Sequence, residues 1–229
     1  MKAFLFDLDG TLIDSMPHHH KAWVRWHERR GLRIDGPRFF AETAGRSNAE
    51  ILADMLPALS AAQHIDMADE KEALYRELAG VSLALIDGAA EFVTAAHRAG
   101  LKLAVCTAST PQNMALAFER HGIDAWVETV VSPADRRFGG GPEDLLRGKP
   151  HPDIFLEAAR RLGVTAADCV VFEDAPLGIE AARRAGMRAV ALTTTMSADA
   201  FADFDNVLKV APDFVALHPH LLTKAAPHA

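Results

Sequence analysis

Five short apolar runs along the chain have the length of β-strands, and helical patterns separate the later ones. The runs are continuous rather than alternating, which is typical of parallel strands buried on both faces of a sheet. They are Ala3–Phe6, Leu103–Cys106, Val127–Val131, Cys169–Phe172 and Ala189–Leu192. Strands that alternate with helices predict a Rossmann-like, three-layer α/β core with a parallel sheet. In such folds the functional residues lie beyond the carboxyl ends of the strands.

Glycine and proline positions support the helices between these runs. Pro111 and Pro152 suit the first turn of a helix, where an amide donor is not needed. Several predicted helices end at a glycine that suits a left-handed C-terminal cap. These glycines are Gly100, Gly122, Gly163 and Gly186.

The segment from about Ser15 to about Leu83 breaks the alternation, because it shows one helical pattern after another and no strand-like run. Within it, the sequence 47–50 has the form of a capping box that opens a helix over Ala49–Met55. We therefore predict a core domain of residues 1–15 and 85–229 and an inserted helical domain of residues 16–84. Hinges are expected near Asp14–Pro17 and Ala79–Gly88.

Two acids follow the first apolar run. Asp7 and Asp9 lie two residues apart, so strand alternation sends both side chains the same way. Gly10 then permits a sharp turn, and Thr11 follows it. Carboxylates this close repel one another unless something compensates their charge. A divalent cation would do so, and so would a reaction in which one acid attacks and the other carries a proton.

The run Asp7-Leu8-Asp9-Gly10-Thr11-Leu12 resembles the signature of the haloacid dehalogenase-like hydrolases. Three further segments resemble motifs of that family in the same order along the chain. They are Val105–Ser109, Gly148–Asp153 and Val170–Ala175. The resemblance spans nearly the whole chain, and it implies that the helical insert is a cap. The chain is most similar to the β-phosphoglucomutase and sugar-phosphatase branch, which has a small helical cap.

The resemblance implies a role for each acid. Asp7 would be the nucleophile that forms an aspartyl-phosphate, and Asp9 would be the general acid and base. Asp7, the backbone carbonyl of Asp9 and Asp174 would hold Mg²⁺, which prefers hard oxygen ligands. Glu173 would reach the metal through water or, as an alternative, cap a helix or form an ion pair.

Phosphate binding is expected from Thr107, Ala108 and Lys149. Thr107 and Ala108 follow a strand where a helix begins, and hydroxyl and amide groups at such a place bind phosphate oxygens. Ser109 or Thr110 is expected to cap that helix instead. Lys149 would neutralise the transferring phosphoryl group and temper the repulsion among the acids.

The same resemblance places substrate contacts in the helical insert. His19 and Trp23 match the branch's segment after the first motif, and His19 would steady Asp9 or time its rotation as the cap closes. The neighbouring His18 and His20 are expected to be solvated in the first helical turn, or to have partial metal affinity without a function.

Lys71 and Tyr75 lie four residues apart on a predicted helix and so share a face. The mutase-like cap carries a Lys and a Tyr at this spacing, and its Lys meets the distal phosphate. An exposed Lys beside a half-buried Tyr is the alternative. Asn48 stands where these mutases carry an Arg, and the arginine of this chain is displaced to Arg46, which weakens recognition of two phosphates. Arg46 is still expected to reach a phosphate or a sugar carboxylate with its forked donors.

Composition narrows the remaining choices. The 229 residues carry a net charge of −7, which argues against a nucleic-acid surface. Neither a signal-peptide core nor a membrane-spanning run is apparent, and Cys106 and Cys169 fit buried small hydrophobes, so we expect a cytoplasmic protein. We also expect a monomer or weak homodimer, a flexible loop at 138–142 and a frayed end after Leu222.

These observations favour an Mg²⁺-dependent phosphatase that acts on small phosphorylated metabolites, above all sugar phosphates. β-Phosphoglucomutase is the alternative with the same aspartyl-phosphate chemistry. A pyrophosphatase or a phosphoglycolate-type phosphatase differs from these only in its cap. A catalytically silent binding protein is disfavoured, because the chain retains all four motifs. Loss of any one acid would have been enough to abolish catalysis.

Overall fold

The structure is a computed structural model that describes residues 1–43, 46–139, 141 and 144–223. Its contacts divide the chain into two compact units. The core unit combines residues 1–14 with residues 85–229, and the helical unit is residues 15–84. Use of the helical unit as a cap stays a prediction.

Among the described residues, six strands of the core unit form one parallel sheet in the order β3-β2-β1-β4-β5-β6. The strands are β1 (Ala3–Phe6), β2 (Lys102–Cys106), β3 (Thr129–Val131), β4 (Cys169–Glu173), β5 (Arg188–Leu192) and β6 (Val207–Ala211). The predicted parallel α/β architecture is confirmed, and β3 is shorter than its apolar run. The sequence prediction missed β6, an edge strand whose central Lys209 is exposed.

Alternation along β1 divides the core into two layers. Ala3 and Leu5 pack into the cluster formed with α7 and α8. Phe4 and Phe6 point to the opposite face, where their rings join an aromatic cluster with Phe92, Phe172 and Phe214. Both faces of this strand are therefore apolar, which explains the continuous hydrophobic run in the sequence.

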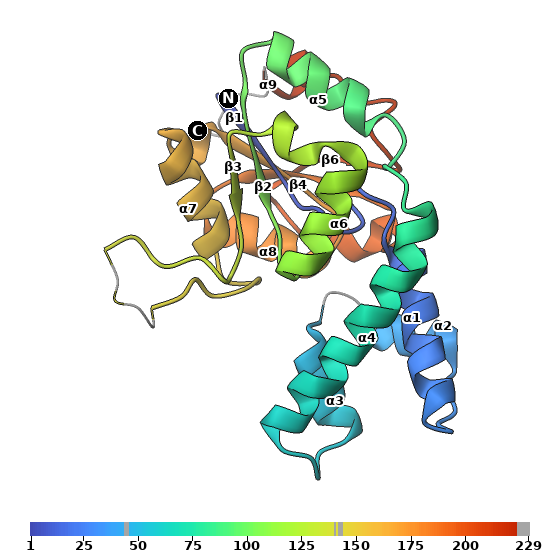
Figure 1. Cartoon of the computed structure of the whole chain (residues 1–229). Helices are drawn as coiled ribbons and strands as arrows, with labels where there is room; N and C mark the ends of the chain where they lie inside the picture. The colour runs from blue at the N-terminus through green and yellow to red at the C-terminus, as the bar shows by residue number, and fades with distance from the viewer. Residues whose placement is uncertain (44–45, 140, 142–143, 224–229) are drawn as a thin grey trace. The chain divides into compact units, whose positions relative to one another are not determined.

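Helices cover both faces of the sheet (Figure 1). Among those of the core unit, α7 packs against β2 and β3, α8 against β4 and β5, and α5 against β2. The helices are α5 (Ala89–Arg98), α6 (Pro111–His121), α7 (Asp153–Leu162), α8 (Pro176–Arg184) and α9 (Pro219–Thr223). The four glycines predicted at helix ends all have positive φ, between 65° and 75°. Pro111 opens α6 as predicted, whereas Pro152 is the residue before α7.

The described part of the helical unit contains helices and no strand. The helices are α1 (Met16–Arg29), α2 (Gly36–Thr43), α3 (Asn48–Met55) and α4 (Ala61–Ser82). The predicted capping box of α3 is present, with Ser47 and Glu50 bonded reciprocally. A second capping box, Ser60 with Gln63, begins α4. Among the described residues, the most extensive packing within the unit is between α1 and α4, where Trp26 is fully buried.

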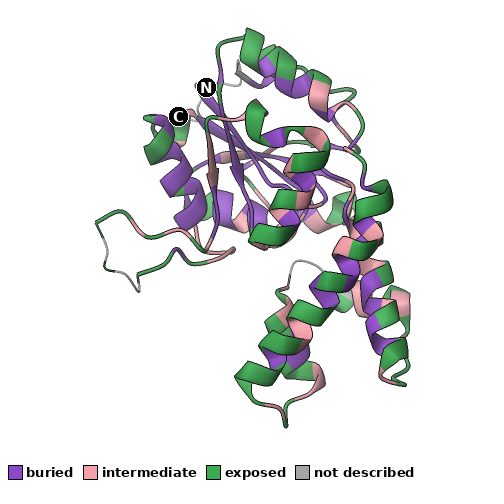
Figure 2. Cartoon of the chain, viewed as in Figure 1, coloured by how far each residue is buried: buried purple, intermediate pink, exposed green. Residues whose placement is uncertain are grey.

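Burial follows the sheet. The central strands β1, β2, β4 and β5 are almost continuously buried, while the edge strands β3 and β6 and the outer faces of the helices are partly or fully exposed (Figure 2). Cys106 and Cys169 are buried free thiols, as predicted, and burial raises the pKa of Cys169 to about 12 and raises that of Cys106 as well.

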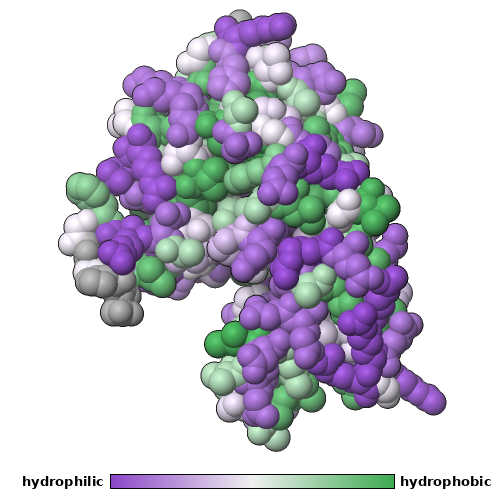
Figure 3. All heavy atoms as spheres, in the orientation of Figure 1, coloured by the Kyte–Doolittle hydropathy of each residue, from purple (hydrophilic) through white to green (hydrophobic). Residues whose placement is uncertain are grey.

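Hydrophilic and hydrophobic side chains are mixed over the face drawn in Figure 3. In the part of the chain that the structure describes, no helix has the length and apolar character needed to cross a bilayer. The predicted flexible loop at 138–142 includes Gly140 and Pro142, which lie outside the described residues, and so do residues 224–229 of the predicted frayed end.

Candidate active site

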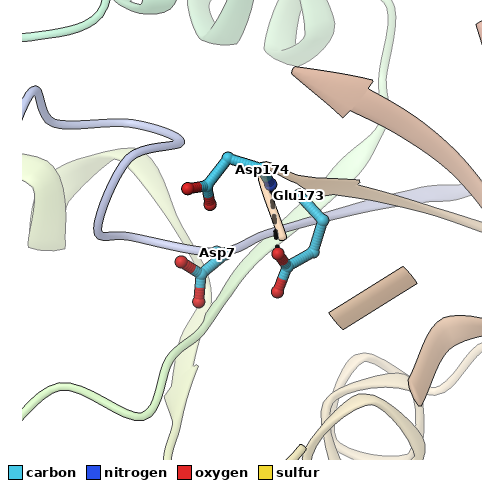
Figure 4. Close-up of side chains that lie close together, drawn as sticks. All are labelled: Asp7, Glu173 and Asp174. Atoms are coloured by element: carbon cyan, nitrogen blue, oxygen red, sulfur yellow. Dashed lines mark hydrogen bonds between the residues drawn. The ribbon is translucent and has the colours of Figure 1, made fainter. Parts of the chain in front are cut away.

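Two neighbouring strands bring three predicted acids to one edge of the sheet. Phe6 of β1 lies level with Phe172 of β4, and the amide of Asp7 donates to the carbonyl of Phe172 at 3.0 Å. Asp7 therefore emerges beside Glu173 and Asp174, and all three are buried. Ligand oxygens of the three carboxylates lie within 4.8 Å of one another (Figure 4).

The turn after Asp7 is shaped to fit Asp174. Gly10 has a φ of 74°, and a Cβ at this position would lie 2.2 Å from an oxygen of Asp174. The hydroxyl of Thr11 donates to the Asp174 carboxylate at 3.0 Å, and that of Thr194 donates to the carbonyl of Gly10 at 2.5 Å. The glycine is thus required both by the backbone conformation and by the close approach of a carboxylate. Sequence reasoning missed Thr194, because nothing in its own segment links it to a turn 184 residues away.

Lys149 lies within the acid cluster. Its ammonium pairs with Asp7 and, at 2.5 Å, with Glu173. The second oxygen of Glu173 accepts the amides of Asp174 and Ala175 at 3.1 and 3.2 Å. The ion-pair alternative for Glu173 is therefore seen in its contacts, while its carboxylate also belongs to the acid cluster. The capping alternative is wrong, because the amides that Glu173 accepts precede α8, whose N-cap Ala175 has no side-chain cap.

Burial dominates the electrostatics of this cluster. It raises the pKa of Asp7 well above its ordinary value despite the attraction of Lys149. It also raises the pKa of Asp174 to about 7, with repulsion from Glu173 adding to the effect. Burial alone would lower the pKa of Lys149, but Asp7 and Glu173 outweigh it and raise that pKa.

The cluster fits a divalent cation. With the three carboxylates and Lys149 ionised, two negative charges remain uncompensated in a buried place. A dication with a preference for oxygen ligands would balance that excess. Asp7 and Asp174, with Glu173 close by, are the side chains that would hold it.

Asp9 lies in the turn that follows β1 and is partly exposed. Its neighbours fix the backbone there, since the amides of Leu12 and Ile13 both donate to the carbonyl of Leu8. The backbone of Asp9 forms an isolated parallel β-bridge with that of Ile13.

Thr107 lies directly after β2, at the same edge of the sheet, with Ala108 next to it. Its side chain is buried, and its hydroxyl oxygen accepts the amide of Ser109 at 3.0 Å. The hydroxyl hydrogen of Thr107 thus stays a donor. The N-cap of α6 is Thr110, which accepts the amide of Asn113, so capping by Thr110 is confirmed and capping by Ser109 is wrong.

Within the helical unit, three of the predicted contact residues lie together. The ammonium of Lys71 is 2.6 Å from Nδ1 of His19 and 5.5 Å from the ring centre of Trp23. The His19 ring stacks on Tyr75 with centroids 3.8 Å apart. Lys71 and Tyr75 are both buried, so the alternative of an exposed lysine beside a half-buried tyrosine is wrong.

Glu72 joins this group and was missed from the sequence. Its Oε1 atom accepts from Lys71 at 2.9 Å and from the amide group of Asn48 at 2.5 Å. The carboxylate is buried and belongs to α4, one residue after Lys71. The predicted Arg46 has other contacts, since its guanidinium pairs with Asp54 at 2.5 Å and donates to the carbonyl of Glu50.

The expectation that His18 is solvated is wrong, whereas His20 is partly exposed. His18 is buried, with Nε2 3.0 Å from the hydroxyl of Ser82. His20 stacks on Phe40 with centroids 3.8 Å apart. Both rings therefore contribute to packing within the helical unit.

Comparisons with known proteins agree with these motifs. A family model described as haloacid dehalogenase-like hydrolase matches residues 1–186. The chain is 34% identical to validoxylamine A 7′-phosphate phosphatase of Streptomyces hygroscopicus subsp. limoneus, with 91% of this chain and 93% of that protein covered. It is 30% identical to β-phosphoglucomutase of Bacillus subtilis, with 83% and 82% covered.

A solved structure adds the fold. A haloacid dehalogenase hydrolase of family IA, variant 3, from Entamoeba histolytica superposes with a TM-score of 0.85 at 26% identity. The match covers 97% of this chain and 98% of that one. The likeness therefore includes both the sheet and the helical insert.

Proposed function

The chain belongs to the haloacid dehalogenase-like hydrolases, and on that premise we propose that it is an Mg²⁺-dependent phosphatase acting on phosphorylated sugars or polyols. The grouping of Asp7, Glu173, Asp174 and Lys149 carries the proposal. In this group a buried carboxylate nucleophile lies beside the ammonium of Lys149, and the three acids could also hold a divalent metal ion. Phosphoryl transfer depends on such positioned charge.

Asp7 is the proposed nucleophile. Its carboxylate attacks phosphorus, a bond forms between a carboxylate oxygen and the phosphoryl group, and the bond to the leaving oxygen breaks. Asp9 donates a proton to that oxygen, so that a neutral alcohol leaves. Asp9 then takes a proton from water as the water attacks the aspartyl-phosphate, which releases phosphate and restores Asp7.

The remaining groups offset charge on the phosphoryl oxygens. Lys149 already contacts Asp7, so its ammonium lies beside the reacting atom. The hydroxyl of Thr107 and the backbone of Ala108 donate to phosphoryl oxygens at the end of β2. When bound, Mg²⁺ would neutralise negative charge on the acids and on the substrate phosphate.

The helical unit is the proposed source of substrate selection. Its buried Lys71 is paired with Glu72, and its Arg46 is paired with Asp54, so neither cation offers an uncompensated charge. A second phosphate on the substrate would meet little net positive charge there. These pairings favour a monophosphate over the bisphosphate intermediate that a mutase needs.

A substrate panel with Mg²⁺ tests the proposal. Phosphate release is measured from sugar and polyol phosphates, phosphoglycolate and pyrophosphate, and β-glucose 1-phosphate is tested for isomerisation. We expect release from sugar or polyol monophosphates that is abolished in Asp7→Asn. Asp168→Asn is the matched control, because Asp168 pairs with Lys2 on the exposed surface and leaves the acid cluster intact.

Other outcomes redirect the proposal. Isomerisation with little phosphate release would identify a mutase. Release confined to pyrophosphate or phosphoglycolate would change the substrate class. Substantial activity in Asp7→Asn would remove Asp7 as the nucleophile.

A further inference from the structure

The segment that leads from β3 to Lys149 folds back on itself. Arg136 and Leu145 form an antiparallel bridge, and the amide of Leu146 donates to the carbonyl of Asp135 at 3.0 Å. In Figure 1 this yellow segment extends away from the sheet before it returns to α7. Its described residues thus form a paired arm, and the returning side of this arm ends at the catalytic lysine.

Asp153 holds the returning side of the arm. This carboxylate begins α7, and its side chain is only 5% exposed. It accepts four hydrogen bonds, which come from three groups of Arg147 and one of Arg137. The donors are the Arg147 amide at 3.1 Å, Arg147 Nε at 3.1 Å, Arg147 Nη2 at 2.9 Å and Arg137 Nη2 at 2.6 Å.

These bonds fix both backbone and side chain close to Lys149. Arg147 lies two residues before Lys149, and the carboxylate binds its amide as well as its guanidinium. Arg137 ties the outgoing side of the arm to the same carboxylate. Charge-assisted, two-point contacts of this kind restrict orientation more than single neutral bonds do.

A role confined to α7 does not account for these contacts. An acid in the first turn of a helix commonly offsets the helix dipole. Among the described residues, however, the hydrogen bonds to the Asp153 carboxylate come from the arm and not from amides of α7. The arginines also lower the pKa of Asp153, so it stays ionised for this pairing.

We propose that Asp153 is a positioning residue for the reaction: by holding Arg147 and Arg137 it sets where Lys149 stands beside Asp7. This inference rests on the proposed phosphatase function for its catalytic consequence. On this proposal the paired arm holds Lys149 in place through its bonds to the buried Asp153. Asp153 acts through Lys149 and does not touch the substrate.

The first test is Asp153→Asn, which keeps the shape of the side chain and removes its charge. We expect kcat to fall by about tenfold to a hundredfold, because a misplacement on the order of 1 Å has such an effect in an active site. KM should change by less than about twofold, since the lysine acts on charge that develops in the transition state. Arg147→Lys, which keeps the charge but loses the two-point contact, should lower kcat in the same direction.

Glu180→Gln on α8 is the matched control. Glu180 also binds two arginines, Arg183 and Arg184, but they belong to its own helix and hold no catalytic segment. Loss of this carboxylate should leave kcat unchanged. Thermal unfolding of each variant shows whether it is folded.

A double-mutant cycle separates positioning from general damage. In a Lys149→Ala background, Asp153→Asn should have no further effect on kcat beyond about twofold, because the group it positions is gone. An equal loss of kcat in both backgrounds would show that Asp153 acts independently of Lys149. That result, or full activity in Asp153→Asn and Arg147→Lys, would overturn the proposal.

Amide hydrogen exchange tests the clamp without any substrate. Residues 144–151 should exchange faster in Asp153→Asn than in wild type and should be unchanged in Glu180→Gln. Unchanged exchange in Asp153→Asn would overturn the clamp. If the wild-type protein hydrolyses no phosphomonoester, the proposed function fails, and this measurement still decides whether Asp153 holds the arm.

Discussion

Lys149 in the core unit is largely buried, Lys71 in the helical unit is fully buried, and both are paired with carboxylates, yet their surroundings differ. Lys149 lies among acids from β1 and β4 whose negative charge exceeds its own. Lys71 is paired with Glu72, the next residue of its own helix. The first lysine therefore belongs to a site with room for another cation, and the second to a locally neutral pair.

The two pairs also depend on different levels of structure. Asp7 and Lys149 are 142 residues apart, and they meet only because parallel strands and the arm bring them together. Lys71 and Glu72 are adjacent on α4, and contacts with His19 of α1 and Asn48 of α3 hold their side chains within the same unit. Chemistry is thus expected from the long-range site, and selectivity from the local one.

Removal of Lys149 should have the largest effect. Lys149→Ala is expected to lower kcat by about 10²–10³ on every substrate, because a charge that stabilises the transition state is lost. Lys71→Ala should change the ranking of substrates more than the best kcat. Steady-state kinetics of both variants on one panel checks this contrast. Equal losses in the two variants would contradict it.

The second prediction concerns Glu72. Glu72→Gln removes the partner charge of Lys71 and should raise kcat/KM for bisphosphates relative to monophosphates, on the order of tenfold. Glu77→Gln, on the same helix in an exposed pair with Arg25, is the control and should leave that ratio unchanged. Competition assays with paired substrates give the ratio directly. An unchanged ratio in Glu72→Gln would separate this group from substrate selection.

The third prediction uses pH to probe the acid cluster. Native Asp174 has a pKa raised to about 7, so between pH 4 and 7 the metal-free native state binds more protons than the unfolded state. The stability of the metal-free protein should therefore fall as pH rises through that range. Added Mg²⁺ should raise Tm more at pH 8 than at pH 5, by several degrees. Calorimetry with Mg²⁺ or a chelator measures both trends, and a pH-independent shift would argue against this site.

The smallest effects should come from the helix caps of the two units. Ser47→Ala and Thr110→Ala each remove an N-cap and should lower the free energy of unfolding by about 1 kcal/mol. Thr110 caps α6 three residues after Thr107, so Thr110→Ala should also raise KM. Ser47→Ala should leave the kinetic constants unchanged. Denaturant unfolding and steady-state kinetics on the two variants test this difference.

The fold was largely predictable because its central strands are buried on both faces. Phe4 and Phe6 point one way and Leu5 the other, so this apolar run could be recognised as a strand from the sequence alone. The edge strand β6 was missed because Lys209 interrupts its apolar pattern. Single polar substitutions at an edge conceal a strand that central positions would reveal.

The candidate site was predictable where a motif carried it. Asp7 and Asp174 stand at strand ends that parallel pairing brings together. Glu72 and Asp153 were missed as functional groups, because their partners Asn48 and Arg137 lie 24 and 16 residues away in sequence and only folding joins them. Whether the predicted site residues act as proposed is for the variants above to decide.

The two buried thiols give this protein an experimental advantage. Burial raises the pKa of both Cys106 and Cys169, so little thiolate exists at neutral pH to react with maleimides. We therefore expect little labelling of the native cysteines by thiol reagents. One cysteine introduced at the exposed Val81 and another at the exposed Val215 would take a donor and an acceptor dye. Energy transfer between them would test whether the distance between these two positions changes during turnover.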